Sequence, residues 1–198
     1  RAATRERLAA LGLGRDDAAI PESFSYYDQV LDAAVAVGAV PTRFAGLVGA
    51  DGSVDLAGYF TIARGEGDNA PLEMTKWFDS NYHYLVPEIG PETDFRLASD
   101  SLVREFEEAR DAGFVTRPVI VGPVTFLLLS KASDEAPEGF RPLSRLADLL
   151  PVYRELLARL GAAGAPWVQL DEPALVSESI EEPRAEVLEA LRTAYADL

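Results

Sequence analysis

The sequence predicts an α/β fold in which short strands of a parallel sheet alternate with longer amphipathic helices. Residues 117–121 and 167–171 are short apolar runs between helix-like segments, as is typical of parallel strands that are covered on both faces. Residues 74–77 form a third strand-like run. Polar residues stand at the carboxyl ends of these runs, and in a barrel that edge carries the function. The helix lengths fit either a (βα)8 barrel or a doubly wound sheet, although the strands are too few for a complete barrel.

The segments between these strands have helical periodicity. Ser25 and Ser53 are candidate N-caps of two helices, and Pro151 is expected to divide the longest one because it lacks an amide hydrogen. No glycine-rich phosphate fingerprint follows any strand, which weakens a nucleotide-binding interpretation. In chain order, the predicted helices span residues 3–11, 25–37, a short segment from Ser53 towards Gly65, 99–112, 143–160 and 184–198.

The composition limits the possible classes of function. The 198 residues are 48% hydrophobic and 26% charged, as in a soluble globular protein, and no apolar run approaches the roughly 20 residues of a membrane helix. The net charge of −15 argues against nucleic acid or an anionic membrane as a partner. An anionic ligand would need local positive groups. The lack of cysteine excludes disulfides and cysteine-ligated metal within these residues.

Residues 72–88 mix aromatic and polar side chains more densely than any other stretch. Polar groups that make directed hydrogen bonds, placed between flat apolar walls, suit a small-molecule site. The alternative is a buried loop whose polar groups satisfy one another. The polar members are Lys76, Asp79, Asn81 and His83, and the aromatic members are Trp77, Phe78, Tyr82 and Tyr84.

Lys76 is the strongest candidate for binding an anion. It ends a mostly apolar run in an acidic protein, so solubility alone explains it poorly. The alternative is an ion pair with Glu73, Asp79 or Glu88. His83 is the only histidine, and we expect it to be packed and hydrogen-bonded between its tyrosine neighbours, because one histidine without cysteine cannot build a metal site.

Asp171 and Glu172 place two carboxylates at the end of a predicted strand. Paired carboxylates serve acid–base and glycosidic chemistry, but adjacent residues of a strand point to opposite sides, so only one can face a site. The alternative is that the pair fixes the strand end through hydrogen bonds. A barrel hydrolase using Asp171 or Glu172 would need a second carboxylate elsewhere, and a non-catalytic scaffold module is a further possibility.

Five motifs of this sequence also occur, in the same order, in one known family. The longest and most specific is residues 73–88, Glu-Met-Thr-Lys-Trp-Phe-Asp-Ser-Asn-Tyr-His-Tyr-Leu-Val-Pro-Glu. The shorter motifs are residues 24–32, 117–127, 149–153 and 167–175. They are spread along the chain, which resembles over nearly its whole length the N-terminal domain of cobalamin-independent methionine synthase.

The resemblance implies a pair of (βα)8 barrels that face each other across a cleft. In this family, zinc in the C-terminal barrel binds homocysteine as a thiolate, which attacks the N5-methyl group of 5-methyltetrahydropteroyltriglutamate. The N-terminal barrel lacks the metal site, braces the cleft and helps to hold the polyglutamate tail of the folate. The resemblance therefore implies a cytoplasmic methyltransferase of methionine biosynthesis.

The family motif also assigns residues. It implies that Lys76 contacts the polyglutamate tail, with Asn81 as a second and less supported candidate. It assigns no catalytic residue and no metal ligand to this chain. We expect residues 1–198 to be part of an N-terminal barrel, incomplete as it stands, inactive alone and without zinc. The family's first strand with its basic Arg-Glu-Leu-Lys-type element, the closing strands and the zinc barrel are expected to lie outside these residues.

Overall fold

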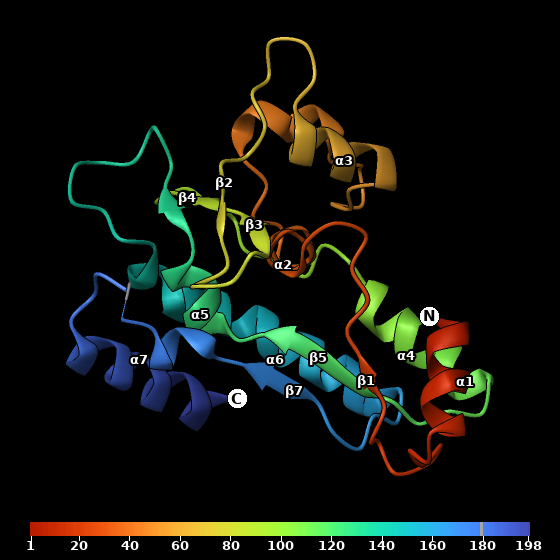
Figure 1. Ribbon diagram of the computed structural model, residues 1–198. Helices are drawn as coiled ribbons and strands as arrows, with labels where there is room; N and C mark the ends of the chain where they lie inside the picture. Colours follow the sequence, from red (N-terminus) through yellow and green to blue (C-terminus); the bar gives the residue numbers. More distant parts are fainter. Residues whose placement is uncertain (179) are drawn as a thin grey trace.

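The computed structural model describes residues 1–178 and 180–198 and has a three-stranded parallel sheet at its centre (Figure 1). The strands are β1 (Pro21–Glu22), β5 (Arg117–Val121) and β7 (Gln169–Asp171), in the order β1-β5-β7. β5 pairs in parallel with both neighbours. The parallel strands predicted at residues 117–121 and 167–171 are therefore confirmed, although β7 begins at Gln169.

Helices connect and cover the sheet. They are α1 (Ala2–Ala10), α2 (Gln29–Ala36), α3 (Leu56–Arg64), α4 (Ser101–Asp111), α5 (Pro123–Leu128), α6 (Leu146–Ala162) and α7 (Arg184–Asp197), with 3-10 helices η1 (Thr42–Leu47), η2 (Pro142–Arg145) and η3 (Pro173–Val176). α4 packs against α6, and α6 runs behind β5 and β7 in Figure 1. The Tyr153 hydroxyl of α6 donates to the Val121 carbonyl oxygen at 2.8 Å, which joins this helix to the core face of β5.

The segment between β1 and α4 leaves the sheet and forms the upper lobe of Figure 1. It contains α2, η1 and α3, followed by an antiparallel hairpin of β2 (Met74–Lys76) and β3 (His83–Leu85). Residues 74–77 were expected to form a parallel strand, and this prediction is wrong. Only residues 77–82 separate the two strands, whereas a parallel connection needs a crossover of about a dozen residues or more.

The remaining strands form a small parallel pair. β4 (Glu88–Ile89) follows the hairpin and pairs with β6 (Lys131–Ala132), which follows α5. The molecule is thus a mixed α/β domain, and within the described residues its strands form three separate sheets and no closed barrel. In the same part of the chain, no helix combines the length and the apolar character needed to cross a membrane.

Three details of the helices differ from expectation. Asp28, not Ser25, is the N-cap of α2, and Asp55, not Ser53, is the N-cap of α3. Each aspartate accepts hydrogen bonds from backbone N–H groups of the first helical turn. The break expected at Pro151 is absent, because α6 is continuous through it. Apolar residues are buried on both sides of the proline, and their burial outweighs the one hydrogen bond that it removes.

Candidate functional site

The hairpin turn at residues 77–82 is ordered by its own hydrogen bonds. The Trp77 N–H donates to the Tyr82 carbonyl oxygen at 2.7 Å. The N–H and the hydroxyl of Ser80 both donate to the Trp77 carbonyl oxygen, at 3.1 and 2.6 Å. Phe78 has a φ of +50°, a left-handed conformation that costs a residue with a Cβ about 1–2 kcal/mol. Strain of this kind is concentrated where a backbone shape serves a site.

One face of the hairpin packs towards the core. The Trp77 ring meets Tyr82 and Tyr84 edge-on, at centroid distances of 6.2 and 5.9 Å. Tyr84 is buried, its hydroxyl donates to the Leu129 carbonyl oxygen at 3.2 Å, and burial raises its pKa to about 12. The aromatic residues on this face are therefore packing residues.

The other face of the hairpin is exposed and carries Lys76 and His83, which stand directly opposite each other in the β2–β3 register. Lys76 forms no ion pair with any residue that the structure describes. The carboxylates of Glu73 and Glu88 instead lie 3.1 and 3.6 Å from Nζ of Lys131. The two lysines of the chain thus differ, because the charge of Lys131 is neutralised while that of Lys76 is free for a ligand.

Asn81 lies in the turn beside His83. It is exposed, and its backbone carbonyl oxygen accepts a hydrogen bond from Nδ1 of His83 at 3.0 Å. The structure therefore brings the two predicted binding residues, Lys76 and Asn81, onto one hairpin. The backbone of Asn81 orients the imidazole. His83 is hydrogen-bonded as expected, but it is exposed rather than packed between its tyrosine neighbours.

The base of the hairpin is tied to α2 by Asp28, whose side chain is fully buried. Its Oδ1 accepts hydrogen bonds from the Val30 N–H at 3.0 Å and from the Tyr82 hydroxyl at 3.3 Å. Its Oδ2 accepts from the N–H groups of Leu31 at 2.9 Å and Leu85 at 3.0 Å. A single carboxylate therefore joins the first turn of α2 to β3 and positions the hairpin.

Two carboxyls on α2 have perturbed ionisation. Burial raises the pKa of Asp28, and the hydrogen bonds from backbone N–H groups oppose this shift. Asp32, one turn later, accepts a hydrogen bond from the Tyr59 hydroxyl at 2.7 Å, and burial raises its pKa to about 6. Burial next to the Asp32 carboxyl also raises the pKa of Tyr59. The lobe under the hairpin thus rests on buried polar contacts.

The carboxylate of Glu172, at the end of β7, has a structural role. It accepts hydrogen bonds from the N–H groups of Val124 and Thr125, at 3.2 and 2.6 Å, and so caps the N-terminus of α5. The Tyr195 hydroxyl of α7 donates to the same carboxylate at 3.1 Å. Burial raises the pKa of Glu172, while these donors lower it.

Gly122 allows Glu172 to approach α5 closely, since a Cβ at this glycine would lie 2.3 Å from the Glu172 carboxyl carbon. Asp171 accepts a hydrogen bond from the side-chain amide of Gln169 at 2.7 Å, within its own strand. These contacts are those of a pair that fixes the strand end, which is the alternative to the acid–base interpretation.

The hairpin turn lies against the carboxyl end of β7. A cleft of about 840 Å³ separates the turn from the segment that follows the strand. Its lining residues are Trp77, Phe78, Asp79 and Ser80 of the turn and Pro173, Val176, Ser177 and Glu178 after β7. The turn therefore faces, across this cleft, the segment that follows the carboxyl end of β7.

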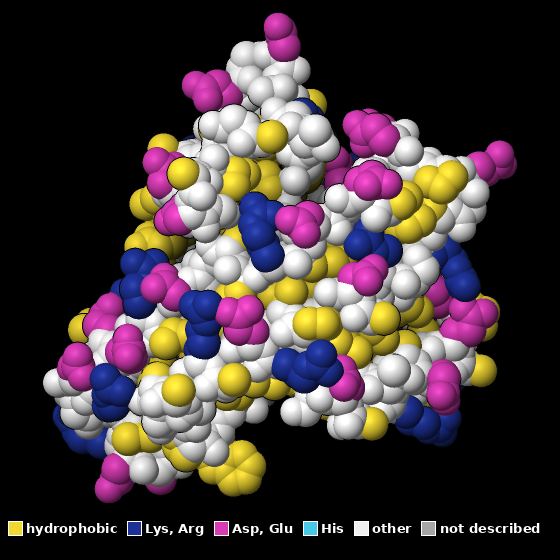
Figure 2. Space-filling model, turned by 180° about the vertical axis from the view of Figure 1, so that it is seen from behind, with side chains coloured by type: hydrophobic (Ala, Val, Ile, Leu, Met, Phe, Trp, Pro, Cys, Tyr) yellow, Lys and Arg dark blue, Asp and Glu magenta, His cyan; other side chains and the backbone are white. Residues whose placement is uncertain are grey.

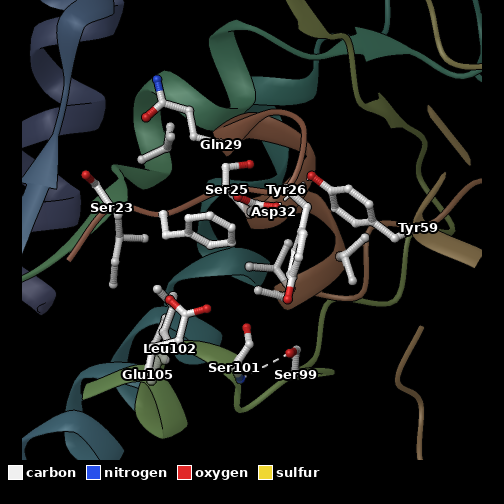
Figure 3. Close-up of a pocket in the computed structure, with 18 of the residues that line it drawn as sticks. Ser23, Ser25, Tyr26, Gln29, Asp32, Tyr59, Ser99, Ser101, Leu102 and Glu105 are labelled. Atoms are coloured by element: carbon white, nitrogen blue, oxygen red, sulfur yellow. Dashed lines mark hydrogen bonds between the residues drawn. The ribbon is translucent and has the colours of Figure 1, made fainter. Parts of the chain in front are cut away.

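A second cavity, of about 300 Å³, lies where the chain leaves β1 (Figure 3). In Figure 3, Asp32 and Ser25 lie on one side of it, and Leu102 and Glu105 of α4 lie on the other. Burial raises the pKa of Glu105 to about 7, against the opposing effect of the guanidinium of Arg1, which lies 2.7 Å away. Both carboxyls therefore have partners in the fold, Asp32 in the Tyr59 hydroxyl and Glu105 in Arg1.

Most other charges are paired on the surface. Figure 2 shows the face behind that of Figure 1, where basic and acidic side chains lie next to one another without a patch of one sign. Typical pairs are Arg154–Asp197 and Arg159–Glu155, both at 2.5 Å. Exposed pairs of this kind contribute about 0–1 kcal/mol, so they mainly balance charge and leave few free cations for a ligand.

The residues of this chain do not fit a zinc site. No group of three or more His, Cys, Asp or Glu side chains able to hold a metal occurs among residues 1–178 and 180–198. The sequence has one histidine and no cysteine, and the single His83 is exposed on the hairpin. No metal-dependent step is therefore assigned to this chain.

Sequence reasoning missed the buried carboxyl of Asp28 and the half-buried carboxyls of Asp32 and Glu105. A signal for Asp28 was available, since an aspartate two residues before the apolar run Val30–Leu31 is a typical N-cap. Its contact with β3 had no such signal, because it joins residues 57 positions apart in the chain.

Comparisons with known proteins agree on one family. Residues 4–198 match the family model described as "Cobalamin-independent synthase, N-terminal domain". Three similar relatives are named 5-methyltetrahydropteroyltriglutamate–homocysteine methyltransferase. They come from Streptomyces coelicolor (54% identical over 100% of this chain and 24% of the relative), Streptomyces griseus (61% over 78% and 20%) and Catharanthus roseus (51% over 89% and 22%).

The chain spans about a quarter of the length of the curated relatives that it matches. Within that quarter, the match includes the hairpin that carries Lys76 and the strand end that carries Glu172. The chain belongs to the family of cobalamin-independent synthase N-terminal domains.

Proposed function

We propose that this chain is the N-terminal part of a cytoplasmic cobalamin-independent methionine synthase, which transfers the methyl group of 5-methyltetrahydropteroyltriglutamate to homocysteine. The family match over residues 4–198 and the names of relatives at 51–61% identity support this proposal. Because the chain covers about a quarter of those relatives, its own contribution is one portion of the substrate site.

We propose further that the domain is part of a (βα)8 barrel. Three strands that are consecutive in the sheet, β1, β5 and β7, run parallel, and the helices α4 and α6 connect them. This is the βα repeat of a barrel wall. In that arrangement, the lobe with α2, α3 and the hairpin is the connection that follows β1, at the carboxyl edge of the sheet.

The role proposed for this chain is binding of the polyglutamate tail by Lys76 and Asn81, both on the hairpin. The observation that carries the proposal is the free charge of Lys76 among the described residues, at the start of a turn that lies against the end of β7. A tail of carboxylates needs local positive charge in a chain of net charge −15. The methyl transfer and its zinc site are proposed to lie in the C-terminal barrel, outside these residues.

The decisive variant is Lys76→Met in the complete synthase, with Lys131→Met as its matched control. Both changes remove one lysine charge and keep the apolar stem, but only Lys131 is held in ion pairs, by Glu73 and Glu88. One charge-assisted contact is worth about 1.5–3 kcal/mol, or roughly tenfold to a hundredfold in affinity. We therefore expect Lys76→Met to raise the KM for the triglutamate folate by about this factor.

The pattern of the change is as informative as its size. A tail contact exists in the ground state and in the transition state alike, so kcat should change little. The KM for the monoglutamate folate, and both parameters of Lys131→Met, should stay near wild type. Equal losses for monoglutamate and triglutamate, or a fall in kcat at constant KM, would show that Lys76 does not bind the tail.

A further inference from the structure

The hairpin register places a second polar side chain beside the proposed tail-binding lysine. Lys76 and His83 are direct cross-strand partners of an antiparallel pair. Side chains in such a pair project from the same face, with Cβ atoms about 4.5–5.5 Å apart. Both residues are exposed, so the two side chains reach the same volume of solvent on this face.

The imidazole of His83 is oriented by the turn. Its Nδ1 lies 3.0 Å from the Asn81 carbonyl oxygen, which only accepts hydrogen bonds, so Nδ1 carries the hydrogen. A neutral ring with its hydrogen on Nδ1 has a bare, accepting Nε2. The ring therefore donates from Nε2 only in the protonated form, and an anion bound at Nε2 selects that form.

We propose that His83 is a second anion-binding residue of the hairpin, which donates from Nε2 to one carboxylate of the polyglutamate tail while Lys76 contacts a neighbouring carboxylate. This inference rests on the function proposed for Lys76 and deepens it. It also gives Asn81 a defined role, because its backbone orients the imidazole.

The charged surroundings of His83 leave room for this role. Opposite it on β2 is Lys76, and Asp79 lies in the turn between the strands. Glu73, at the far end of β2, is held by Lys131 at 3.1 Å. Asp28, the N-cap of α2, is buried beneath the hairpin, where it accepts hydrogen bonds from the Tyr82 hydroxyl and from backbone N–H groups. No carboxylate of the described residues forms an ion pair with the imidazole, so this donor is left to a ligand.

Because the imidazole donates from Nε2 only when both ring nitrogens carry hydrogen, lower pH favours this contact with the tail. The tail carboxylates stay ionised between pH 6 and 8, so their charge does not change across this range. Preference for a long tail should therefore be stronger at pH 6 than at pH 8. Groups that act on methyl transfer influence monoglutamate and triglutamate substrates alike, so they cancel in the ratio of the two kcat/KM values.

The test uses the complete synthase with the variants His83→Gln and Lys76→Met. Glutamine is neutral at every pH and keeps a polar side chain. For wild type, we expect the triglutamate-to-monoglutamate ratio of kcat/KM to fall about two- to fivefold from pH 6 to pH 8, the size of one exposed charged contact. For His83→Gln, the ratio should start at the lower value and stay constant with pH.

The two variants separate the two proposals. Lys76→Met should lower the ratio at every pH and keep the pH dependence. If Lys76→Met lowers the ratio but His83→Gln equals wild type at pH 6, the role of His83 is overturned and the role of Lys76 stands. If Lys76→Met leaves the ratio unchanged, the proposed function itself fails. Circular dichroism of both variants should match wild type, because both side chains are exposed.

Discussion

Two carboxylates, the buried Asp28 and the half-buried Glu172, hold two regions of this molecule with the same chemistry. Glu172 caps α5 in the region of the parallel sheet, and Asp28 caps α2 in the lobe that carries the hairpin. Each accepts from two backbone N–H groups at its helix and from one tyrosine hydroxyl, that of Tyr195 or Tyr82. The difference is that Asp28 also accepts from Leu85, in another element.

That difference distinguishes the region of the parallel sheet, which is the scaffold, from the hairpin, which presents the candidate site. The sheet region is held by its apolar core, within which Glu172 joins the end of β7 to α5 and α7. The hairpin has three-residue strands, and its outer face is open to solvent, so its position depends on a few polar contacts. The residues proposed to bind the tail are those that form no ion pair within the described part of the fold, Lys76 and His83, rather than the carboxylates at a strand end.

The largest effect expected from this comparison is that of Asp28→Ala. It removes the cap of α2 and leaves the buried N–H of Leu85 without an acceptor. Cap loss costs about 0.5–2 kcal/mol and an unsatisfied buried group about 1–3 kcal/mol, so the free energy of unfolding should fall by about 2–5 kcal/mol. Urea denaturation measures this loss.

The matched change in the other region is Glu172→Ala, which also removes a helix cap. Both variants should be destabilised, but only Asp28→Ala should speed amide hydrogen exchange at β3. Equal exchange at β3 in the two variants would mean that the hairpin does not depend on Asp28.

The same contrast explains which parts of the fold can be predicted from the sequence. The strands at residues 117–121 and 167–171 are apolar runs between helices, and their parallel pairing follows from that local pattern. The run at residues 74–77 looks alike, yet it forms a hairpin. The hairpin turn was not predicted, because it contains aromatic residues such as Trp77 and has no Asn-Gly or Gly-rich pair, which would mark a turn between two strands.

The candidate site, too, could be predicted from the sequence only in part. The residue type and position of Lys76 could be singled out from the sequence, because it is one of only two lysines in an acidic chain. The absence of an ion pair at Lys76 among the described residues could not be predicted. It arises because Glu73 and Glu88 pair with Lys131, which lies 55 positions further along the chain. Nor could the register that places His83 opposite Lys76 be predicted, because it depends on the length and shape of the turn.

A second, intermediate effect concerns pH and the lobe that supports the hairpin. Burial raises the pKa of Asp32 to about 6, so the folded state holds this proton more tightly than the unfolded state. Between about pH 4 and pH 6 the unfolded state binds fewer protons, and stability must fall as the pH rises. A shift of about two units corresponds to at most about 3 kcal/mol, reduced by partial exposure.

Asp32→Asn should remove this loss and keep an oxygen for the Tyr59 hydroxyl. Relative to wild type, the variant should gain about 1–3 kcal/mol of stability between pH 4 and pH 7.5. Denaturation midpoints at several pH values give the comparison. Glu105 continues to titrate in both proteins, so the difference between their curves reports Asp32. Parallel curves would show that Asp32 ionises normally.

The smallest effect should come from the two tyrosine hydroxyls. In Tyr195→Phe, Glu172 loses a donor at 3.1 Å, and in Tyr82→Phe, Asp28 loses a donor at 3.3 Å. Each carboxylate keeps its backbone donors, so each variant should lose only about 0.5–1.5 kcal/mol of stability. The two changes are therefore matched in stability and differ only in the region that they loosen.

In the complete synthase, Tyr82→Phe should raise the KM for the triglutamate folate more than that for the monoglutamate, because the strand opposite Lys76 is held less firmly. Tyr195→Phe should leave both values unchanged. If both variants alter triglutamate binding equally, the hairpin is not positioned separately from the sheet, and the division between scaffold and presented site is lost.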